Sequence, residues 1–258
     1  MRKKIFIAVT VIILLLLFFI GFLEYRQYSS YKVPIHAGAQ AIIKINADAF
    51  IESFLKEYGF NFRKKINPPG KKEADSAASA GIFIPGNIFI YTLTAKSPST
   101  FFCTVPLSDA ADFKLFMQKK LGVSINDSGQ QNLGTGFNGQ LTVLCSEEYA
   151  AFAYSLQKEE VVSVLRDLLN KKNLIAPTNE LIKKLKEDRS HIVYAEKNGI
   201  ATAEFTGNQV LLHADLIIPD GLSIPLQSRK RSIDGNSYAS FFLNMNYTGE
   251  RWKHLYLH

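Results

Sequence analysis

The run from Gly134 to Gly139 (GTGFNG) spells G-x-G-x-x-G, a motif with a named chemistry. A dinucleotide site built on this motif needs a strand before the glycines and a helix after them, because the helix N-terminus holds the pyrophosphate. Here the residues that follow, 140–145 (QLTVLC), are strand-like and lack helical spacing. The sequence therefore predicts turn glycines between two strands and no nucleotide cofactor.

Metal ligation is the second chemistry that we considered. None of the five histidines has the spacing to a carboxylate or thiolate that a metal site needs. They are His36, His191, His213, His254 and His258. His213 alternates with apolar residues over 210–216, so its side chain is predicted on the solvated face of a strand. We predict no metal site.

Asp109 and Asp112 are the carboxylate pair that paired acid–base catalysis would use. They stand at the start of a predicted helix, where capping and the helix dipole explain acidic residues at this spacing. Nucleophile elbows, phosphate-binding loops and H-E-x-x-H are absent from the sequence. We therefore predict no catalytic residues and a protein that is not an enzyme.

The elements that position such residues begin with an uncharged apolar run over residues 5–23. As a helix this run is about 28 Å long, close to the ~30 Å hydrocarbon thickness of a bilayer. We predict one transmembrane helix here, with residues 1–4 in the cytoplasm. A cleaved signal peptide is the alternative, but its apolar core would be shorter and small residues would follow it, whereas 24–30 reads EYRQYSS.

Residues 24–33 are predicted to be a short polar tether. Tyr25, Tyr28 and Tyr31 suit the aromatic belt at the outer membrane–water interface. The basic residues of 1–4 favour a cytoplasmic N-terminus. Residues 34–258 would then form an extracytoplasmic, periplasmic domain held at the cytoplasmic (inner) membrane by a single pass.

Charge argues against nucleic acid as a partner. The chain carries a formal net charge of +7, of which the first 32 residues account for +4. The remainder is too weakly basic to suggest nucleic-acid binding, and residues 229–231 (RKR) are predicted to be a solvated loop. Cys103 and Cys145 lie in strand-like runs; an oxidising compartment permits a disulfide, but the sequence does not decide whether they pair.

The hydrophobic pattern predicts an α+β fold. Residues 41–145 read strand, helix, strand, strand, helix, strand, which fits an antiparallel sheet with helices on one face, a split β-α-β-like unit. Late hairpins suggest a second partial unit from about residue 190, and 67–80 reads as a loop. The predicted strands are 41–46, 82–91, 100–107, 141–144, 150–154, 191–195, 200–205 and 210–218.

Four helices follow from apolar residues at three-and-four spacing. In the first, the buried stripe would comprise Phe50, Ile51, Phe54, Leu55 and Tyr58. The second would begin at Ser108 or Asp109 and end at Gly122, the third carries an apolar face over 161–169, and the fourth covers 181–185.

Three segments resemble a family of uncharacterised cell-envelope proteins of Bacteroidota-type bacteria. These are residues 33–46 (VPIHAGAQAIIKIN), 81–91 and 101–109, and the similarity covers about 33–125. The resemblance implies an envelope location and an α+β fold, and it brings no activity, cofactor or catalytic residue. Members often begin with a lipid-modified Cys and are longer, which would agree with a second unit cut short.

These observations lead to one expected function and two alternatives. We expect a membrane-anchored, non-catalytic scaffold or binding module that engages another envelope protein or a surface polymer, with the bilayer bound through residues 5–23. A hydrolase or transferase with a loop-built site, near 67–80, is the first alternative. A lipid- or small-ligand-binding domain is the second, because the chain holds 19 Phe and 11 Tyr.

Overall fold

The computed structural model describes residues 2–58, 80–128, 131–206, 209–216, 222–223 and 246–247. Contacts divide the chain into two units, Met1–Asp215 and Leu216–His258. In the second unit β11 (Leu222–Ser223) pairs with β12 (Asn246–Tyr247) in antiparallel fashion. The predictions that concern 59–79, 229–231, His254 and His258 lie outside the described residues.

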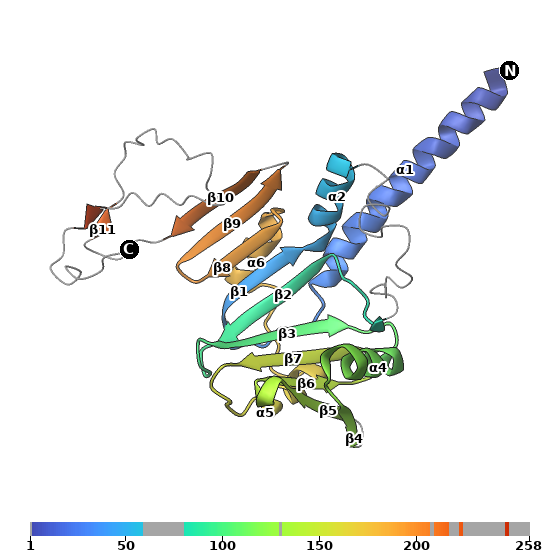
Figure 1. Ribbon diagram of the computed structural model, residues 1–258. Helices are drawn as coiled ribbons and strands as arrows, with labels where there is room; N and C mark the ends of the chain where they lie inside the picture. The colour runs from blue at the N-terminus through green and yellow to red at the C-terminus, as the bar shows by residue number, and fades with distance from the viewer. Residues whose placement is uncertain are drawn as a thin grey trace, which may run out of the picture. The chain divides into compact units, whose positions relative to one another are not determined.

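The first unit is built on a ten-stranded antiparallel sheet in the order β10-β9-β8-β1-β2-β3-β7-β6-β5-β4 (Figure 1). Because β8 pairs with β1, residues beyond 190 extend this sheet, and the predicted second unit from about 190 is wrong. The strands are β1 Ala39–Asn46, β2 Asn87–Leu93, β3 Thr100–Pro106, β4 Ile125–Ser128, β5 Gln131–Gly136, β6 Leu141–Cys145, β7 Tyr149–Ser155, β8 Ile192–Glu196, β9 Gly199–Thr206 and β10 Gln209–Leu216.

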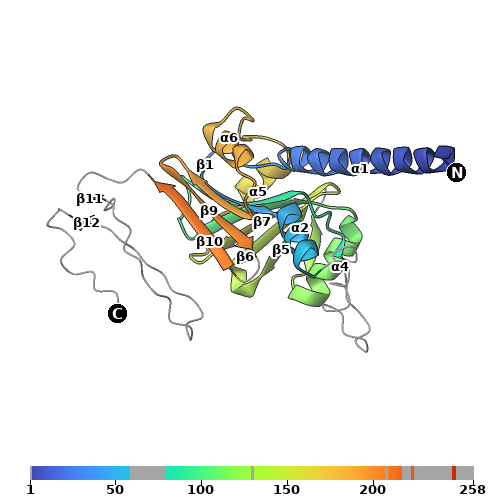
Figure 2. The same ribbon diagram turned by 90° about the horizontal axis from the view of Figure 1, so that it is seen from above.

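Helices cover both faces of the sheet (Figure 2). Beside α1, described below, they are α2 (Ala47–Tyr58), α4 (Ala110–Leu121), α5 (Val162–Leu169) and α6 (Glu180–Glu187), with a 3-10 turn, η3, at Phe137–Gly139. The core under α5 and α6 contains Ala151 and Ala153, whereas Phe113 of α4 packs edge-on against Phe152, with ring centroids 6.0 Å apart. Adjacent residues of a strand point to opposite faces. We call these the α5 face and the α4 face.

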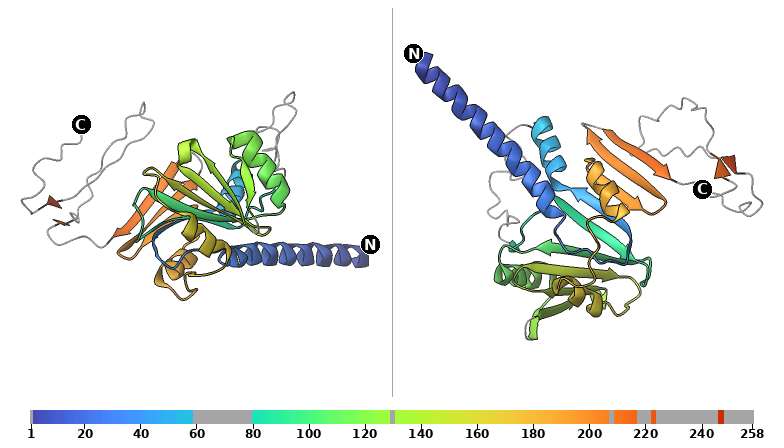
Figure 3. Two further views of the ribbon diagram at one scale, coloured as in Figure 1. Left: turned by 90° about the horizontal axis from the view of Figure 1, so that it is seen from below. Right: turned by 180° about the vertical axis from the view of Figure 1, so that it is seen from behind.

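The α+β class is confirmed, but the prediction of helices on one face only is wrong. The reason lies in β7, where Ala150, Ala151 and Ala153 are fully buried, so both faces of the strand are covered. A strand that is apolar on both faces needs a packing layer on each side. Figure 3 shows α4 and α5 on opposite sides of this strand.

Several helix boundaries follow local rules. The side chain of Asp109 accepts a hydrogen bond from the N–H of Asp112 at 2.9 Å, and Gly122 ends α4 in the left-handed conformation. These two predictions are confirmed, as are the buried apolar stripes of α5 and α6. The predicted stripe of α2 is wrong in part, since Ile51 and Phe54 are exposed.

α1 (Arg2–Ser30) is one continuous helix of 29 residues. The predicted tether over 24–33 is therefore helical as far as Ser30. Tyr31 does not project into an aromatic belt: its ring lies 5.2 Å from that of Phe89, and its hydroxyl donates to the carbonyl of Leu185 at 2.8 Å. Burial raises the pKa of Tyr31 well above its ordinary value.

Among the residues that the structure describes, no helix meets the length and hydropathy of a membrane span. Side chains at 5–9, 11–12, 15–16 and 19–20, which belong to the apolar run, lie outside the description. The transmembrane helix over 5–23 stays a prediction.

Candidate functional site

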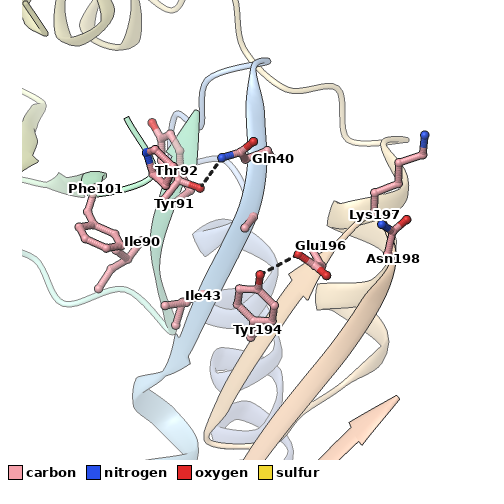
Figure 4. Close-up of a pocket in the computed structure, with 12 residues that line it drawn as sticks. Gln40, Ile43, Ile90, Tyr91, Thr92, Phe101, Tyr194, Glu196, Lys197 and Asn198 are labelled. Atoms are coloured by element: carbon pink, nitrogen blue, oxygen red, sulfur yellow. Dashed lines mark hydrogen bonds between the residues drawn. The ribbon is translucent and has the colours of Figure 1, made fainter. Parts of the chain in front are cut away.

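A groove with a volume of about 550 Å³ lies on the α4 face, over the central strands (Figure 4). Its lining comes from the neighbouring strands β8, β1, β2 and β3 and from the β2–β3 and β8–β9 turns. The lining residues are Gln40, Ala41, Ile43, Ile90, Tyr91, Thr92, Pro98, Phe101, Tyr194, Glu196, Lys197 and Asn198.

The floor of the groove is apolar and its two sides are aromatic. Ile43 of β1 pairs with Ile90 of β2 and with Tyr194 of β8, so the three side chains form one row across the sheet. Phe101 stands on β3, next to β2. Three strand spacings separate β8 from β3, or about 14 Å. The rings of Tyr194 and Phe101 therefore bound a floor that is wide enough for an extended peptide segment or an oligosaccharide.

The same row explains why the groove is open. It continues from Ile90 to Cys103 and then to Phe152. α4 covers the row at Phe152, while on the other side Phe50 of α2 packs against Phe205, with ring centroids 5.2 Å apart. Within the described residues, these two helices leave the middle of the α4 face exposed, and the groove occupies that gap.

Polar groups line the rim at the end of the strands opposite α1. The side-chain amide of Gln40 donates to Oγ1 of Thr92 at 3.4 Å, and the hydroxyl of Tyr194 donates to Oε2 of Glu196 at 2.9 Å (Figure 4). Burial, followed by this hydrogen bond, raises the pKa of Tyr194. Nζ of Lys184 donates to the carbonyls of Glu196 and Lys197 at 2.9 and 3.1 Å, which holds the β8–β9 turn in place.

A second hollow of about 500 Å³ contains a serine and a histidine in hydrogen-bond contact. Oγ of Ser53 lies 2.6 Å from Nε2 of His191. The N–H of Phe205 donates to Nδ1 of the same ring at 3.3 Å, so Nε2 carries the proton and donates to Ser53. A base that activates serine needs an unprotonated Nε2. The arrangement fits a structural hydrogen bond rather than nucleophilic catalysis.

Sequence reasoning missed both the groove and the Ser53–His191 contact. The two residues are 138 positions apart, and no local motif marks either one. The ring of His191 packs against those of Phe50 and Phe205, at 4.9 and 5.6 Å, a contact that the order of residues does not indicate. The hydrophobic pattern identified β1, β2 and β8 as strands, but it could not show which part of the sheet stays uncovered.

The prediction of turn glycines between two strands is right only in part, since of the three glycines of the motif only Gly139 lies in the turn. Gly134 and Gly136 belong to β5, and a 3-10 turn leads into β6. A Cβ on Gly134 would lie 2.8 Å from Ile125 and 3.0 Å from Val123, and one on Gly136 would lie 2.5 Å from Val123. These glycines make room for the buried Val123 and do not cradle a phosphate.

The two cysteines do not pair, and the described histidines, cysteines and carboxylates form no metal-binding cluster. Cys103 on β3 and Cys145 on β6 are separated by β7, and they form no disulfide. Burial raises the pKa of the Cys103 thiol to about 12, which favours the protonated thiol at neutral pH. No group of three or more His, Cys, Asp or Glu that could hold a metal ion occurs among the described residues.

His213 is exposed on β10, as predicted. Val210 and Leu212 are exposed too, so the apolar alternation over 210–216 does not mark a buried face of this strand. β10 is the last strand at its edge of the sheet, where packing on either face is least complete.

No protein-family model and no curated protein matches this sequence. Solved structures of TP0453 show a weak structural likeness to this chain. Crystal form I of TP0453 has a TM-score of 0.47 at 9% identity, and the match covers 72% of this chain and 77% of the TP0453 chain. Crystal form IV has a TM-score of 0.43 at 9% identity, covering 70% and 79%. Crystal form III has a TM-score of 0.42 at 11% identity, covering 69% and 75%.

Proposed function

We propose that this chain is a single-pass, membrane-anchored binding module without catalytic activity. Residues 5–23 would span the cytoplasmic membrane, and the sheet domain would stand on its extracytoplasmic side. The groove on the α4 face would capture an envelope protein or a surface polymer. The envelope resemblance noted over 33–125 agrees with this location and stays a prediction.

The observation that carries the proposal is the uncovered middle of the α4 face. An apolar floor between two aromatic side chains, with polar groups at one rim, is the usual composition of a binding site. Phe101 is 37% exposed, which is a high exposure for a phenylalanine that belongs to a central strand. Aromatic side chains in such positions supply much of the free energy of binding in known interfaces.

The position of the groove supports the same function. α1 leads into the domain at the Asn46 end of β1, because Gln27 donates to the side chain of Asn46 at 3.0 Å. The groove instead lies around Gln40, toward the other end of the same strand. A domain anchored through α1 would therefore present the groove away from the lipid, where a partner can reach it.

Site-specific photocrosslinking in intact cells tests the proposal. A photoreactive phenylalanine analogue replaces Phe101 in the full chain, and the same analogue at Phe137 is the control. Phe137 is 53% exposed in the turn before β6 and does not line the groove. A discrete adduct at 101 that is missing at 137 is expected. Equal or absent adducts at both positions would contradict a binding role for the groove.

A hydrolase remains the competing function, because Ser53 and His191 lie in contact. Ser53→Ala in the purified full chain separates the two. Any ester or amide hydrolysis that disappears with this substitution would favour the hydrolase. We expect none, since Nε2 of His191 donates to the serine.

A further inference from the structure

Two segments of the domain are bonded to Arg26, three residues past the apolar run of α1, and they expose four large apolar side chains. Phe83 is 50% exposed, Ile84 42%, Ile51 46% and Phe54 47%. Single exposed apolar residues are common on soluble proteins, but a group of them marks a contact surface. We call these four side chains the apolar seat.

The domain begins where the apolar run of α1 ends, with no spacer between them. Glu24, the first residue after the run, forms an ion pair with Arg189 at 3.0 Å. Two residues later, Arg26 donates to the carbonyl of Ile84 at 3.1 Å. These positions are about 1.5 and 4.5 Å past Leu23 along the helix axis. A helix that crosses the bilayer with residues 5–23 would bring this edge of the domain to the lipid surface.

The same arginine ties α2 to this edge. Arg26 forms an ion pair with Asp48 in the first turn of α2 at 3.0 Å. Ile51 follows Asp48 by three residues and Phe54 follows Ile51 by three, so each is a surface neighbour of the one before it. Figures 1 and 3 show α2 beside the Ser30 half of α1. Both parts of the apolar seat are therefore fixed to one residue at the end of the apolar run.

We infer that the apolar seat lies in the lipid headgroup region, as a second contact of the domain with the bilayer that holds α1. This inference rests on the proposed membrane anchor. A single transmembrane helix can tilt in the bilayer, and a domain bonded rigidly to it tilts with it. A second contact, made by these half-exposed apolar side chains, would fix the tilt and direct the groove away from the lipid.

Tryptophan quenching in nanodiscs tests the inference with the full chain. Trp252→Phe removes the native tryptophan, and a single tryptophan is placed by Phe83→Trp. The control is Leu156→Trp, at a side chain that is 55% exposed. Phe83 is bonded to the carbonyl of Pro106 and Leu156 to that of Ser99, so the two positions lie at opposite ends of β3. They are about 20 Å apart along that strand.

A third variant, Phe18→Trp, reports on the anchor itself. The nanodiscs contain phosphatidylcholine brominated near the headgroup, and each variant is compared in brominated and unbrominated discs. The inference expects strong quenching at 18, clear quenching at 83 and none at 156. Quenching at 18 with positions 83 and 156 alike would overturn the apolar seat and leave the anchor standing. No quenching at 18 would overturn the proposed anchor, and the apolar seat with it.

Discussion

The two ends of the central strands differ in how their polar groups are used. At the α1 end, Gln27 donates to Asn46 and to Asp48, both at 3.0 Å, while Asn87 donates to Gln27 and Ser30 at 2.8 and 2.7 Å. At the far end, polar side chains stand at the rim of an open groove. One end is closed by internal hydrogen bonds, and the other offers its groups to solvent.

This difference assigns two roles: the α1 end attaches the helix to the sheet, and the far end is proposed to bind a partner. Asn87 is fully buried and Asn46 nearly so, and buried amides of this kind are costly to leave without partners. The network therefore fixes the angle between α1 and β2. The polar groups at the groove rim also pair, Gln40 with Thr92 and Tyr194 with Glu196. These bonds lie at solvent-accessible positions, where a partner can exchange them for its own at little cost.

The largest effect is expected from Asn87→Ala. The substitution removes two hydrogen bonds and leaves Gln27 and Ser30 short of a donor, so we expect a loss of about 2–4 kcal/mol in the free energy of unfolding. Urea denaturation measures it. Thr92→Ala, on the same strand at the groove end, is the matched control and should cost less than about 1 kcal/mol. Equal losses at both positions would erase the contrast between the two ends.

Lys44 makes the α1 end sensitive to pH. Its side chain is 2% exposed, and Nζ donates to the carbonyls of Leu185 and Asp188. Burial lowers the pKa of Lys44 from 10.5 to about 8, although Asp188 opposes the shift. Between these two values the unfolded chain binds more protons than the folded one, so this group makes stability rise with pH.

Lys44→Met should abolish this rise. The free energy of unfolding of the unsubstituted chain, relative to that of the variant, is expected to increase by up to about 3 kcal/mol as the pH is raised through the window. Urea denaturation at pH values from about 7.5 to 10 measures the difference. Tyr31 and Tyr91 titrate in both proteins, so their effect cancels in first approximation. Parallel curves for the two proteins would show that Lys44 titrates as an ordinary surface lysine.

Substitutions at the groove end should weaken partner binding and leave the free energy of unfolding nearly unchanged. Phe101→Ala and Tyr194→Ala each remove one aromatic side of the groove, and each should lower partner capture about tenfold, or about 1.4 kcal/mol. Crosslinking yield from a reporter at position 198 measures capture, and urea denaturation checks the fold. A large loss of stability with unchanged capture would show that the two rings are core residues instead.

The smallest effect is expected from Ser53→Ala. It removes one hydrogen bond to His191 and should cost about 1 kcal/mol in unfolding free energy, with partner capture unchanged. Thermal denaturation measures the first and crosslinking at position 101 the second. A change in capture would connect this hollow with the groove, which the structure places in a different part of the sheet.

Much of the fold could be predicted because it depends on neighbouring residues. The ends of α4 follow from Asp109 and Gly122, one a side-chain cap and the other a left-handed turn. The strand pattern of β1 and β3 follows from alternating apolar residues. The groove could not be predicted in this way, because Tyr194, Ile43 and Phe101 come together only through strand order and register.

The hydrophobic patterns of α2 and β10 do not identify the buried faces, because they do not show what packs against each face of the element. The spacing of Ile51 and Phe54 in α2 is that of a buried stripe, yet both are exposed, because three-and-four spacing defines a face without naming what lies against it. Likewise the alternation in β10 does not say that the strand ends the sheet. Whether a face is exposed depends on the element that packs against it in the folded structure, and a local sequence pattern does not show that element.

The sequence by itself determined the apolar run over 5–23, the α+β class, the extent of most strands and the caps of α4, since each depends on residues within a few positions of one another. The tertiary structure alone decided that both faces carry helices, that α1 is bonded directly to the sheet, and that no helix of the described residues covers the middle of the α4 face. These features depend on contacts between residues far apart in the chain, for which local hydrophobic patterns hold no information.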